Sequence, residues 1–257
     1  MIIYKTLDEI KKIKKANEII ARLFEDILPK YIKAGISTHE LDQISEDYIK
    51  SQGAVPGTKD YDIGRPYPPY PASTCISVND TVVHGIPDKK IILKDGDIVS
   101  VDTVTVLDGY FGDAAITYAV GEIDEESKKL LEVTEKSRDL GITYAKEGNR
   151  IGDVSHAIQE YVESFGFSLV RDFAGHGVGK EMHEDPMVPN YGKPGTGAKI
   201  EDGMVIAIEP MVNVGKYPVK IMKDMWTVKT KDGSRSAHFE HSVAIVDGKP
   251  LILSVKD

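Results

Sequence analysis

A chain of 257 residues is long enough to bury a substantial core, either as one large domain or as two fused halves. Its composition is globular, and its net charge of −9 excludes a protein whose whole surface binds nucleic acid, because neutralising phosphates requires an excess of Lys and Arg. The single cysteine, Cys75, excludes an intrachain disulfide and a cysteine-based zinc site.

The amino-terminal residues contain no targeting signal. Met1 to Thr6 lead directly into a charged amphipathic segment without an apolar signal core, and no stretch of about 18 consecutive apolar residues occurs in the chain. We therefore expect a cytoplasmic protein with no membrane partner. The lysines at positions 11, 12, 14 and 15 are typical of a solvated helix face, and a docking patch is the alternative.

Two pairs of helices are predicted, one pair in each half of the chain. Thr6 and Glu9 form a capping box that opens a long amphipathic helix, whose helical spacing is expected to continue until Gly35. A second helix is expected to begin near Thr38. Residues 125–146 predict another long helix, and the apolar spacing before Gly166 predicts a fourth.

The segment that follows the second predicted helix is rich in proline. Residues 56–71 hold five prolines among glycines and tyrosines, so they cannot form a regular helix or a central strand. We expect an ordered loop here. Long ordered loops are often functional, and the alternative is a surface loop without a functional role.

The two halves of the chain echo each other at a constant offset of 113 residues. The matching positions are Gly35, Leu41, Tyr48, Ile49 and Gly53 in the first half, and Gly148, Val154, Tyr161, Val162 and Gly166 in the second. Residues 95–102 also parallel residues 202–209, each being a turn, an apolar strand and a final carboxylate. We infer an internal duplication within a single domain over residues 1–257. Its pseudo-twofold halves are roughly 1–122 and 123–257, with a site between them.

Asp102 and Asp113 flank an Asp-Gly turn at residues 108–109, which is typical of the tip of a β-hairpin. Leu107 then pairs with Tyr110, so the two carboxylates lie on neighbouring strands. Apolar residues surround both acids, which predicts that they point into the interior, where a buried carboxylate requires a compensating cation. For these two acids considered alone, the alternative is that they lie on the surface, either solvated or in ion pairs.

The second half supplies a matching pair of acids, Glu209 at the end of an apolar strand and Glu240 at the start of another. Four buried negative charges repel one another unless positive charge lies among them, so two divalent ions about 3.5–4 Å apart are the simplest solution. Four separate ion pairs are the alternative. A dinuclear site can polarise a carbonyl and activate water, which predicts hydrolysis of an amide or ester.

Three histidines accompany the four acids. His176 and His183 lie in a glycine-rich run with little packing bulk, which favours contact with metal or substrate, and His84 ends an apolar strand. The run is not a phosphate-binding loop, because Lys180 is followed by Glu181 rather than by Ser or Thr. Carboxylate and imidazole ligands together suit Mn(II), Fe(II), Co(II) or Zn(II), and the excess of carboxylate favours the harder ions.

Five segments, in their order and spacing, resemble the type I methionine aminopeptidase family over essentially the whole chain. They are residues 75–87, 97–113, 175–179, 208–210 and 239–241. The resemblance implies the pita-bread fold, an α+β fold in which duplicated halves form a curved antiparallel sheet covered by helices. It also implies a dinuclear site on the concave face and removal of the initiator methionine from nascent polypeptides when the second residue is small.

The resemblance further implies roles for individual residues. The implied metal ligands are Asp102, Asp113, His176, Glu209 and Glu240. Among them Asp113 and Glu240 would bridge the two ions, and Glu209 would be the base for the attacking water. His84 would meet the scissile amide nitrogen or pass a proton to the leaving amine, and His183 would hydrogen-bond the carbonyl oxygen as negative charge develops there.

The methionine pocket implied by the resemblance is apolar, partly aromatic and rich in sulfur. Its residues are Tyr67, Tyr70, Cys75, Met182 and Trp226. Such a set can hold a thioether. The chain departs from the family pattern at Met182, where many bacterial members have Phe, and in the proline-rich loop before Cys75, which is longer than usual.

Two other functions are alternatives to this one. An X-Pro aminopeptidase or prolidase shares the fold and the ligand set, but such enzymes usually carry a further amino-terminal domain. A catalytically inactive pita-bread binding protein would be expected to have lost ligands, whereas this chain retains all five. The resemblance also implies a monomer that associates transiently with the ribosome and has no direct nucleic-acid specificity.

Overall fold

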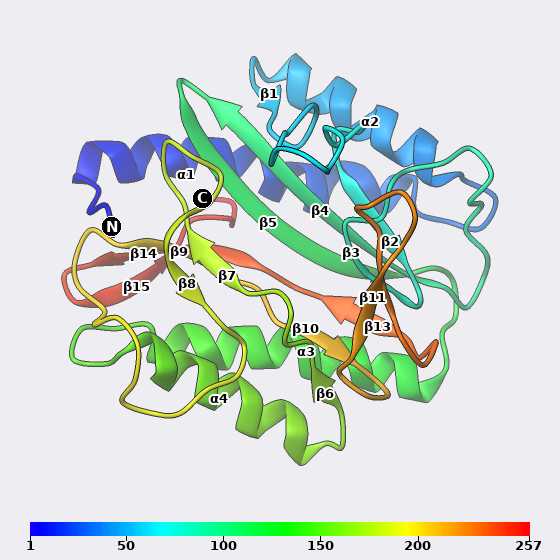
Figure 1. Ribbon diagram of the computed structural model, residues 1–257. Coiled ribbons are helices and arrows are strands. Elements are labelled where there is room, and N and C mark those ends of the chain that lie inside the picture. Colours follow the sequence, from blue (N-terminus) through cyan, green and yellow to red (C-terminus); the bar gives the residue numbers. More distant parts are fainter.

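The computed structural model describes residues 1–257, and its first half places two helices before a long antiparallel strand pair (Figure 1). The elements of this half are α1 (Leu7–Arg22), η1 (Leu23–Ile27), η2 (Leu28–Lys30), α2 (Thr38–Ser51), β1 (Val55–Pro56), β2 (Cys75–Val78), β3 (Thr81–Val83), β4 (Ile98–Leu107) and β5 (Tyr110–Ala119).

The second half begins with another helix pair and continues with shorter strands. Its elements are α3 (Glu125–Tyr144), α4 (Ile151–Ser164), β6 (Ser168–Leu169), β7 (Gly175–Gly177), β8 (Glu184–Val188), β9 (Val205–Ile208), β10 (Met211–Asn213), β11 (Val219–Ile221), β12 (Val228–Thr230), β13 (Ser236–His238), β14 (His241–Val246) and β15 (Lys249–Ile252).

The helices begin where the sequence predicts. Thr6 and Glu9 form the reciprocal capping box of α1, which satisfies backbone N–H groups that have no partner in the first turn. The α-helical part of the first helix is shorter than predicted. It ends at Arg22 and continues as a π turn and then a 3₁₀ turn, where Pro29 supplies no backbone donor. Ser37 caps α2, which starts at Thr38 as predicted.

The strands form antiparallel sheets, and every neighbouring pair runs antiparallel. One four-stranded sheet has the order β1-β4-β2, with β5 paired to β4, and one five-stranded sheet has the order β15-β14-β9-β7-β8. Two three-stranded sheets complete the layer, β13-β10-β6 and β11-β12-β3. The predicted hairpin is confirmed, because Leu107 pairs with Tyr110 across the turn from β4 to β5.

The helices lie outside the strands, with α1 and α2 on one side of the molecule and α3 and α4 on the other (Figure 1). Val99 and Val101 of β4 belong to the core that α1 and α2 cover, while Ile206 and Ile208 of β9 belong to the core under α3 and α4. Successive side chains of a strand point to opposite faces, so Asp102 lies on the face of β4 that is turned away from its helices.

Hydrogen bonds join the two halves across the strand layer. Glu240 donates its backbone N–H to the carbonyl of Ala115 at 2.9 Å, and the Ser242 hydroxyl donates to the carbonyl of Asp113 at 2.8 Å. The Thr117 hydroxyl donates to the carbonyl of His238 at 2.8 Å. These bonds hold β5 beside the segment that carries Glu240. None of the helices has the length and apolar character required to span a bilayer.

Candidate active site

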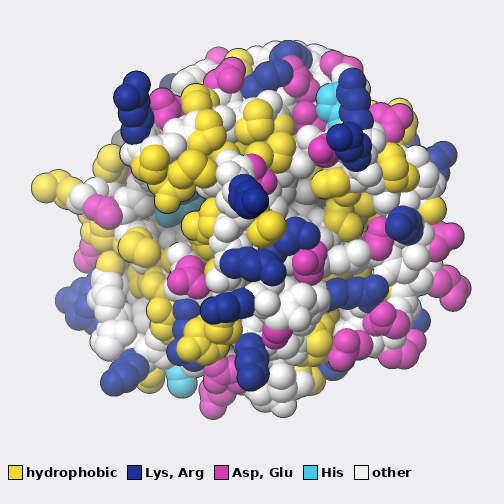
Figure 2. All heavy atoms as spheres, turned by 45° about the vertical axis from the view of Figure 1, so that its right-hand side comes forward, with side chains coloured by type: hydrophobic (Ala, Val, Ile, Leu, Met, Phe, Trp, Pro, Cys, Tyr) yellow, Lys and Arg dark blue, Asp and Glu magenta, His cyan; other side chains and the backbone are white.

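A cavity of about 230 Å³ opens between the two halves and gathers most of the predicted site residues. Its wall includes all four predicted carboxylates, together with His84, His176 and His183. Figure 2 shows a hollow rimmed by hydrophobic side chains, with histidine visible at its bottom. The wall therefore combines an apolar rim with a cluster of acids and imidazoles, as expected of a small-ligand site.

The four carboxylates reach the cavity from two pairs of strands. Asp102 of β4 pairs with Ala115 of β5, and Asp113 of β5 pairs with Val104, so both acids lie in one antiparallel ladder. Glu209 follows β9 and Glu240 precedes β14, and these two strands also pair with each other. Each half of the chain thus supplies two carboxylates.

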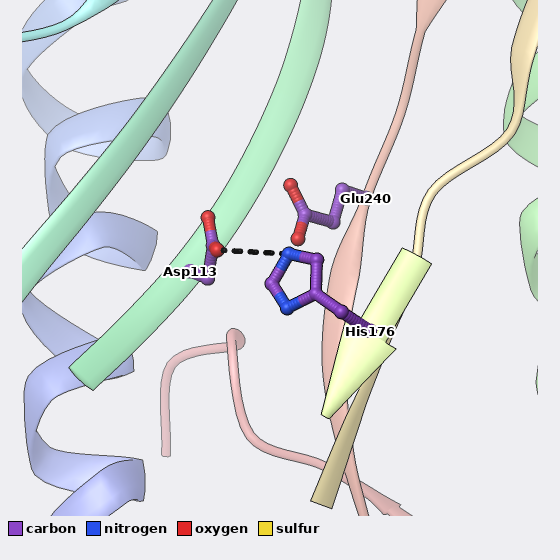
Figure 3. A group of neighbouring side chains, drawn as sticks. All are labelled: Asp113, His176 and Glu240. Carbon is purple, nitrogen blue, oxygen red and sulfur yellow. Dashed lines mark ion pairs between the residues drawn. The ribbon is translucent and has the colours of Figure 1, made fainter. Parts of the chain in front are cut away.

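His176 lies in β7 and faces the acids. Its Nε2 atom is 3.7 Å from Asp113 Oδ2 and 3.5 Å from Glu209 Oε1. Figure 3 shows Asp113, His176 and Glu240 pointing toward one another, and one ligand atom from each lies within 4.8 Å of the others. Atoms at such spacing can share a single cation placed between them.

Burial sets the protonation of this cluster. It raises the pKa of Asp102 to about 6 and that of Glu209 to about 8, because the low-dielectric interior disfavours the charged forms. Burial and the neighbouring carboxylates raise the pKa of Asp113 and Glu240 well above their usual range. Burial also lowers the pKa of His176 to about 4, which leaves a neutral imidazole able to bind a metal.

The residues present fit a divalent cation. The Oε1 atom of Glu240 is buried and has no hydrogen-bond partner within the protein. A buried carboxylate oxygen without a donor is costly unless a cation satisfies it. A divalent ion among the acids would supply that missing partner and would remove the repulsion that raises their pKa values.

His84 and His183 lie on different walls of the cavity. His84 follows β3 in a left-handed backbone conformation, with φ of 57°, and its ring packs edge-on against Phe173 and Trp226. Burial and the neighbouring His238 lower the pKa of His84 to about 4. The ring of His183 packs edge-on against that of His176, with 4.3 Å between centroids.

Four of the five residues predicted for the methionine pocket line the cavity, namely Tyr70, Cys75, Met182 and Trp226. Tyr67 is not among the residues that line the cavity, but it packs against the buried cluster that contains Tyr70, Cys75 and Trp226, with its ring 6.2 Å from that of Trp226. The indole of Trp226 donates its N–H to the carbonyl of Pro68 at 2.8 Å. A role for Tyr67 in the methionine pocket stays a prediction.

Nine further residues of the wall were not predicted from the sequence, and those with ring side chains are Tyr61, Phe173 and His238. Tyr61 comes from the proline-rich loop, whose path no local pattern indicates. His238 is buried, both of its ring nitrogens lack a hydrogen-bond partner, and its Nε2 atom is 3.6 Å from Glu209 Oε2. It precedes Glu240 by two residues, and this spacing in an extended segment was a signal that it shares the side facing the acids.

The chain is similar to known proteins along nearly its whole length. The sequence model of metallopeptidase family M24 matches residues 11–247. The chain is 52% identical to the methionine aminopeptidase of Clostridium acetobutylicum, over 99% of both chains. It is also 52% identical to methionine aminopeptidase 1 of Bacillus subtilis, over 96% of both chains.

Solved structures give the same likeness. A methionine aminopeptidase from Thermotoga maritima superposes with a TM-score of 0.95 at 46% identity and covers 100% of both chains. A prolidase from Pyrococcus furiosus has a TM-score of 0.76 at 24% identity, and the match covers 99% of this chain but 66% of the prolidase. The similarity to the prolidase shows a shared fold alone.

Proposed function

The chain belongs to the metallopeptidase family M24, and we propose that it acts as a methionine aminopeptidase, removing the initiator methionine from new polypeptides whose second residue is small. The resemblance drawn from the sequence motifs and the pita-bread fold that it implied are both confirmed by the full-length relatives. The X-Pro alternative is disfavoured, because the prolidases share the fold at low identity and extend well beyond the matched region. The observation that carries the proposal is the meeting of the acid cluster and an apolar, sulfur-containing pocket in one cavity.

Five residues would hold the metal in this proposal, and they are Asp102, Asp113, His176, Glu209 and Glu240. Two divalent ions, drawn from Co(II), Mn(II), Fe(II) and Zn(II), match four carboxylates better than one ion does. Bound metal would polarise the scissile carbonyl and lower the pKa of water. Asp113 and Glu240 would be shared by the two ions, as the family resemblance implies, and this is supported by the position of their ligand atoms within 4.8 Å of each other and of His176.

The other polar residues would move protons and stabilise charge. Glu209, with a pKa raised by burial, is suited to accept a proton from the attacking water. His84 is kept neutral by burial, so it can accept a hydrogen bond from the substrate amine or peptide nitrogen. His183 would donate to the carbonyl oxygen and stabilise the charge that develops there.

The pocket sets the preference for the first residue. Tyr70 is buried, its hydroxyl donates to the carbonyl of Gly85 at 2.9 Å, and its ring meets Trp226 edge-on at 5.3 Å. Cys75 and Met182 complete an apolar wall that suits a long unbranched thioether. A β-branched first residue would collide with this wall, and a charged one would lose hydration without gaining a partner.

The proposal is tested with a short peptide series. Met-Ala-Ser and Met-Gly peptides should be cleaved well, Met-Leu and Met-Lys peptides poorly, and Ala-Pro peptides hardly at all. Weak cleavage after norleucine or leucine is compatible, since one methylene in a hydrophobic pocket is worth only about 1–3 kcal/mol. Efficient Ala-Pro cleavage without Met-Ala-Ser cleavage would replace the proposal with the X-Pro alternative.

We further propose that the protein works in the cytoplasm as a monomer, on nascent chains at the ribosome. Lysines gather on the segment of residues 216–231 that carries Trp226, and Figure 2 shows Lys and Arg side chains spread over the face turned toward the reader. A local basic surface attracts RNA phosphates even when the net charge is negative. The lysines of α1 support this less well, because Lys11 and Lys14 are paired with carboxylates. Co-sedimentation with ribosomes at low and high salt tests the association.

A further inference from the structure

We propose that Tyr61 is a positioning residue for the reaction, and that its hydroxyl fixes the orientation and the ring tautomer of His183. The inference rests on the proposed function, because it assigns His183 the task of donating a hydrogen bond to the substrate carbonyl. Tyr61 belongs to the proline-rich loop before Cys75.

The contact between the two side chains is direct. The Tyr61 Oη atom lies 2.7 Å from Nδ1 of His183, and the ring centroids are 5.5 Å apart. Both residues line the cavity, where His183 also stacks against His176. One nitrogen of the His183 ring is therefore engaged by the phenol, and the other is left for a substrate.

The direction of this hydrogen bond follows from the ordinary chemistry of the two groups. Above about pH 7 an imidazole is mainly neutral and carries a single N–H, so one of its ring nitrogens must accept. A phenol keeps its proton at this pH and can donate it. The Tyr61 hydroxyl makes no second hydrogen bond within the protein, and its proton is free to go to Nδ1.

Donation by Tyr61 to Nδ1 places the single ring proton of His183 on Nε2. Nε2–H can then donate to a carbonyl oxygen, which is the form the reaction requires. The opposite tautomer would present a lone pair at Nε2 and repel a developing negative charge. A partner at one ring nitrogen thus decides what the other nitrogen can do.

The loop holds Tyr61 in place through its backbone. Tyr61 donates its N–H to the carbonyl of Thr58 at 3.1 Å and accepts from the N–H of Tyr70 at 2.9 Å. The N–H of Asp60 donates to the carbonyl of Tyr70 at 2.8 Å, and the Thr58 hydroxyl donates to the carbonyl of Ser73 at 2.5 Å. Because Tyr70 lines the methionine pocket, the same bonded segment forms part of the pocket and positions His183.

The first test compares single and double variants in peptide hydrolysis. Tyr61→Phe keeps the ring and removes the hydroxyl, and it should lower kcat for Met-Ala-Ser about 3- to 10-fold, as expected for one hydrogen bond, with KM within about twofold. In a His183→Ala background the same change should have less than about a twofold effect, because the two residues act as one unit. Tyr31→Phe, which removes a hydroxyl from an exposed tyrosine outside the cavity, is the matched control. Equal losses of kcat in both backgrounds would overturn the inference.

The second test does not depend on turnover. In zinc-loaded protein with ¹⁵N-labelled histidine, the His183 signals, assigned by their loss in His183→Ala, should show Nε2 protonated and Nδ1 unprotonated. Tyr61→Phe should produce a mixture of the two tautomers. Protonated Nδ1 in the unaltered protein would overturn the inference. A protein with the expected tautomer but no Met-Ala-Ser cleavage would instead contradict the proposed function.

Discussion

Removing the metal should make the stability of this protein fall as the pH rises from 7 to 8. Metal-free protein keeps four buried carboxyl groups together, and burial raises their pKa values, that of Glu209 from 4.5 to about 8. In the unfolded chain these groups are already ionised at pH 7. Unfolding therefore releases protons in this range, and a rise in pH favours the unfolded state.

The size of the effect follows from the shift. For Glu209, a folded pKa near 8 gives a loss of about 1 kcal/mol in the free energy of unfolding between pH 7 and 8. Burial and the neighbouring carboxylates also raise the pKa values of Asp113 and Glu240, so these two groups act in the same direction. The buried histidines contribute little here, because the pKa values of His84 and His176 are lowered to about 4, and both rings are neutral throughout.

The measurement is urea denaturation of chelator-treated protein, followed by circular dichroism at pH 7.0, 7.5 and 8.0. Glu209→Gln should reduce the loss of unfolding free energy between pH 7 and 8 by about 1 kcal/mol. Glu126→Gln, at an exposed position on α3, should leave this loss unchanged. Saturating Mn(II) should abolish the decline, because the bound ion keeps the carboxylates ionised in the folded protein. A free energy of unfolding that stays constant or rises from pH 7 to 8 without metal would contradict the predicted decline.

Three further outcomes are expected. Asp113→Asn should abolish hydrolysis and reduce bound metal while the circular dichroism spectrum persists, and full activity at unchanged metal content would exclude the bridging role. His183→Ala should lower kcat by about 10²–10³, a loss of roughly 3–4 kcal/mol, with metal retained, and a change confined to KM would contradict its role. Gly112→Ala should destabilise the fold by about 1–3 kcal/mol in urea denaturation, because a Cβ atom there would lie 2.6 Å from the backbone nitrogen of Asn17 on α1, and wild-type stability would show that α1 can move away.

The features that were predictable from the sequence depend on local patterns that repeat. The Asp-Gly turn sets the register of β4 and β5, so the placement of Asp102 and Asp113 on neighbouring strands follows from the sequence. In the second half, the apolar runs before Glu209 and after Glu240 predict two strands, and these are found paired as β9 and β14. Each of these inferences needs only strand periodicity and a turn.

The residues that the sequence did not reveal depend on the path of a loop. Tyr61 and Tyr67 both lie in the proline-rich segment, and only the folded structure shows that Tyr61 reaches His183 while the Tyr67 ring lies 6.2 Å from that of Trp226. No periodicity constrains such a segment, since its conformation is fixed by tertiary hydrogen bonds. The early end of the α-helical part of α1 was missed for a related reason, because apolar spacing alone does not separate an α turn from a π turn.

Anaerobic titration of metal-free protein with Mn(II), followed at each addition by both bound metal and cleavage of Met-Ala-Ser, tests whether two ions held between the halves perform the reaction. We expect no cleavage without metal, binding of two equivalents per chain at saturation, and activity that rises with occupancy. Fe(II), Co(II) and Zn(II) in parallel titrations identify the ion that supports the highest kcat/KM. Undiminished cleavage after complete removal of metal would contradict the account, as would saturation of the acid cluster without any cleavage of Met-Ala-Ser by any of the four ions.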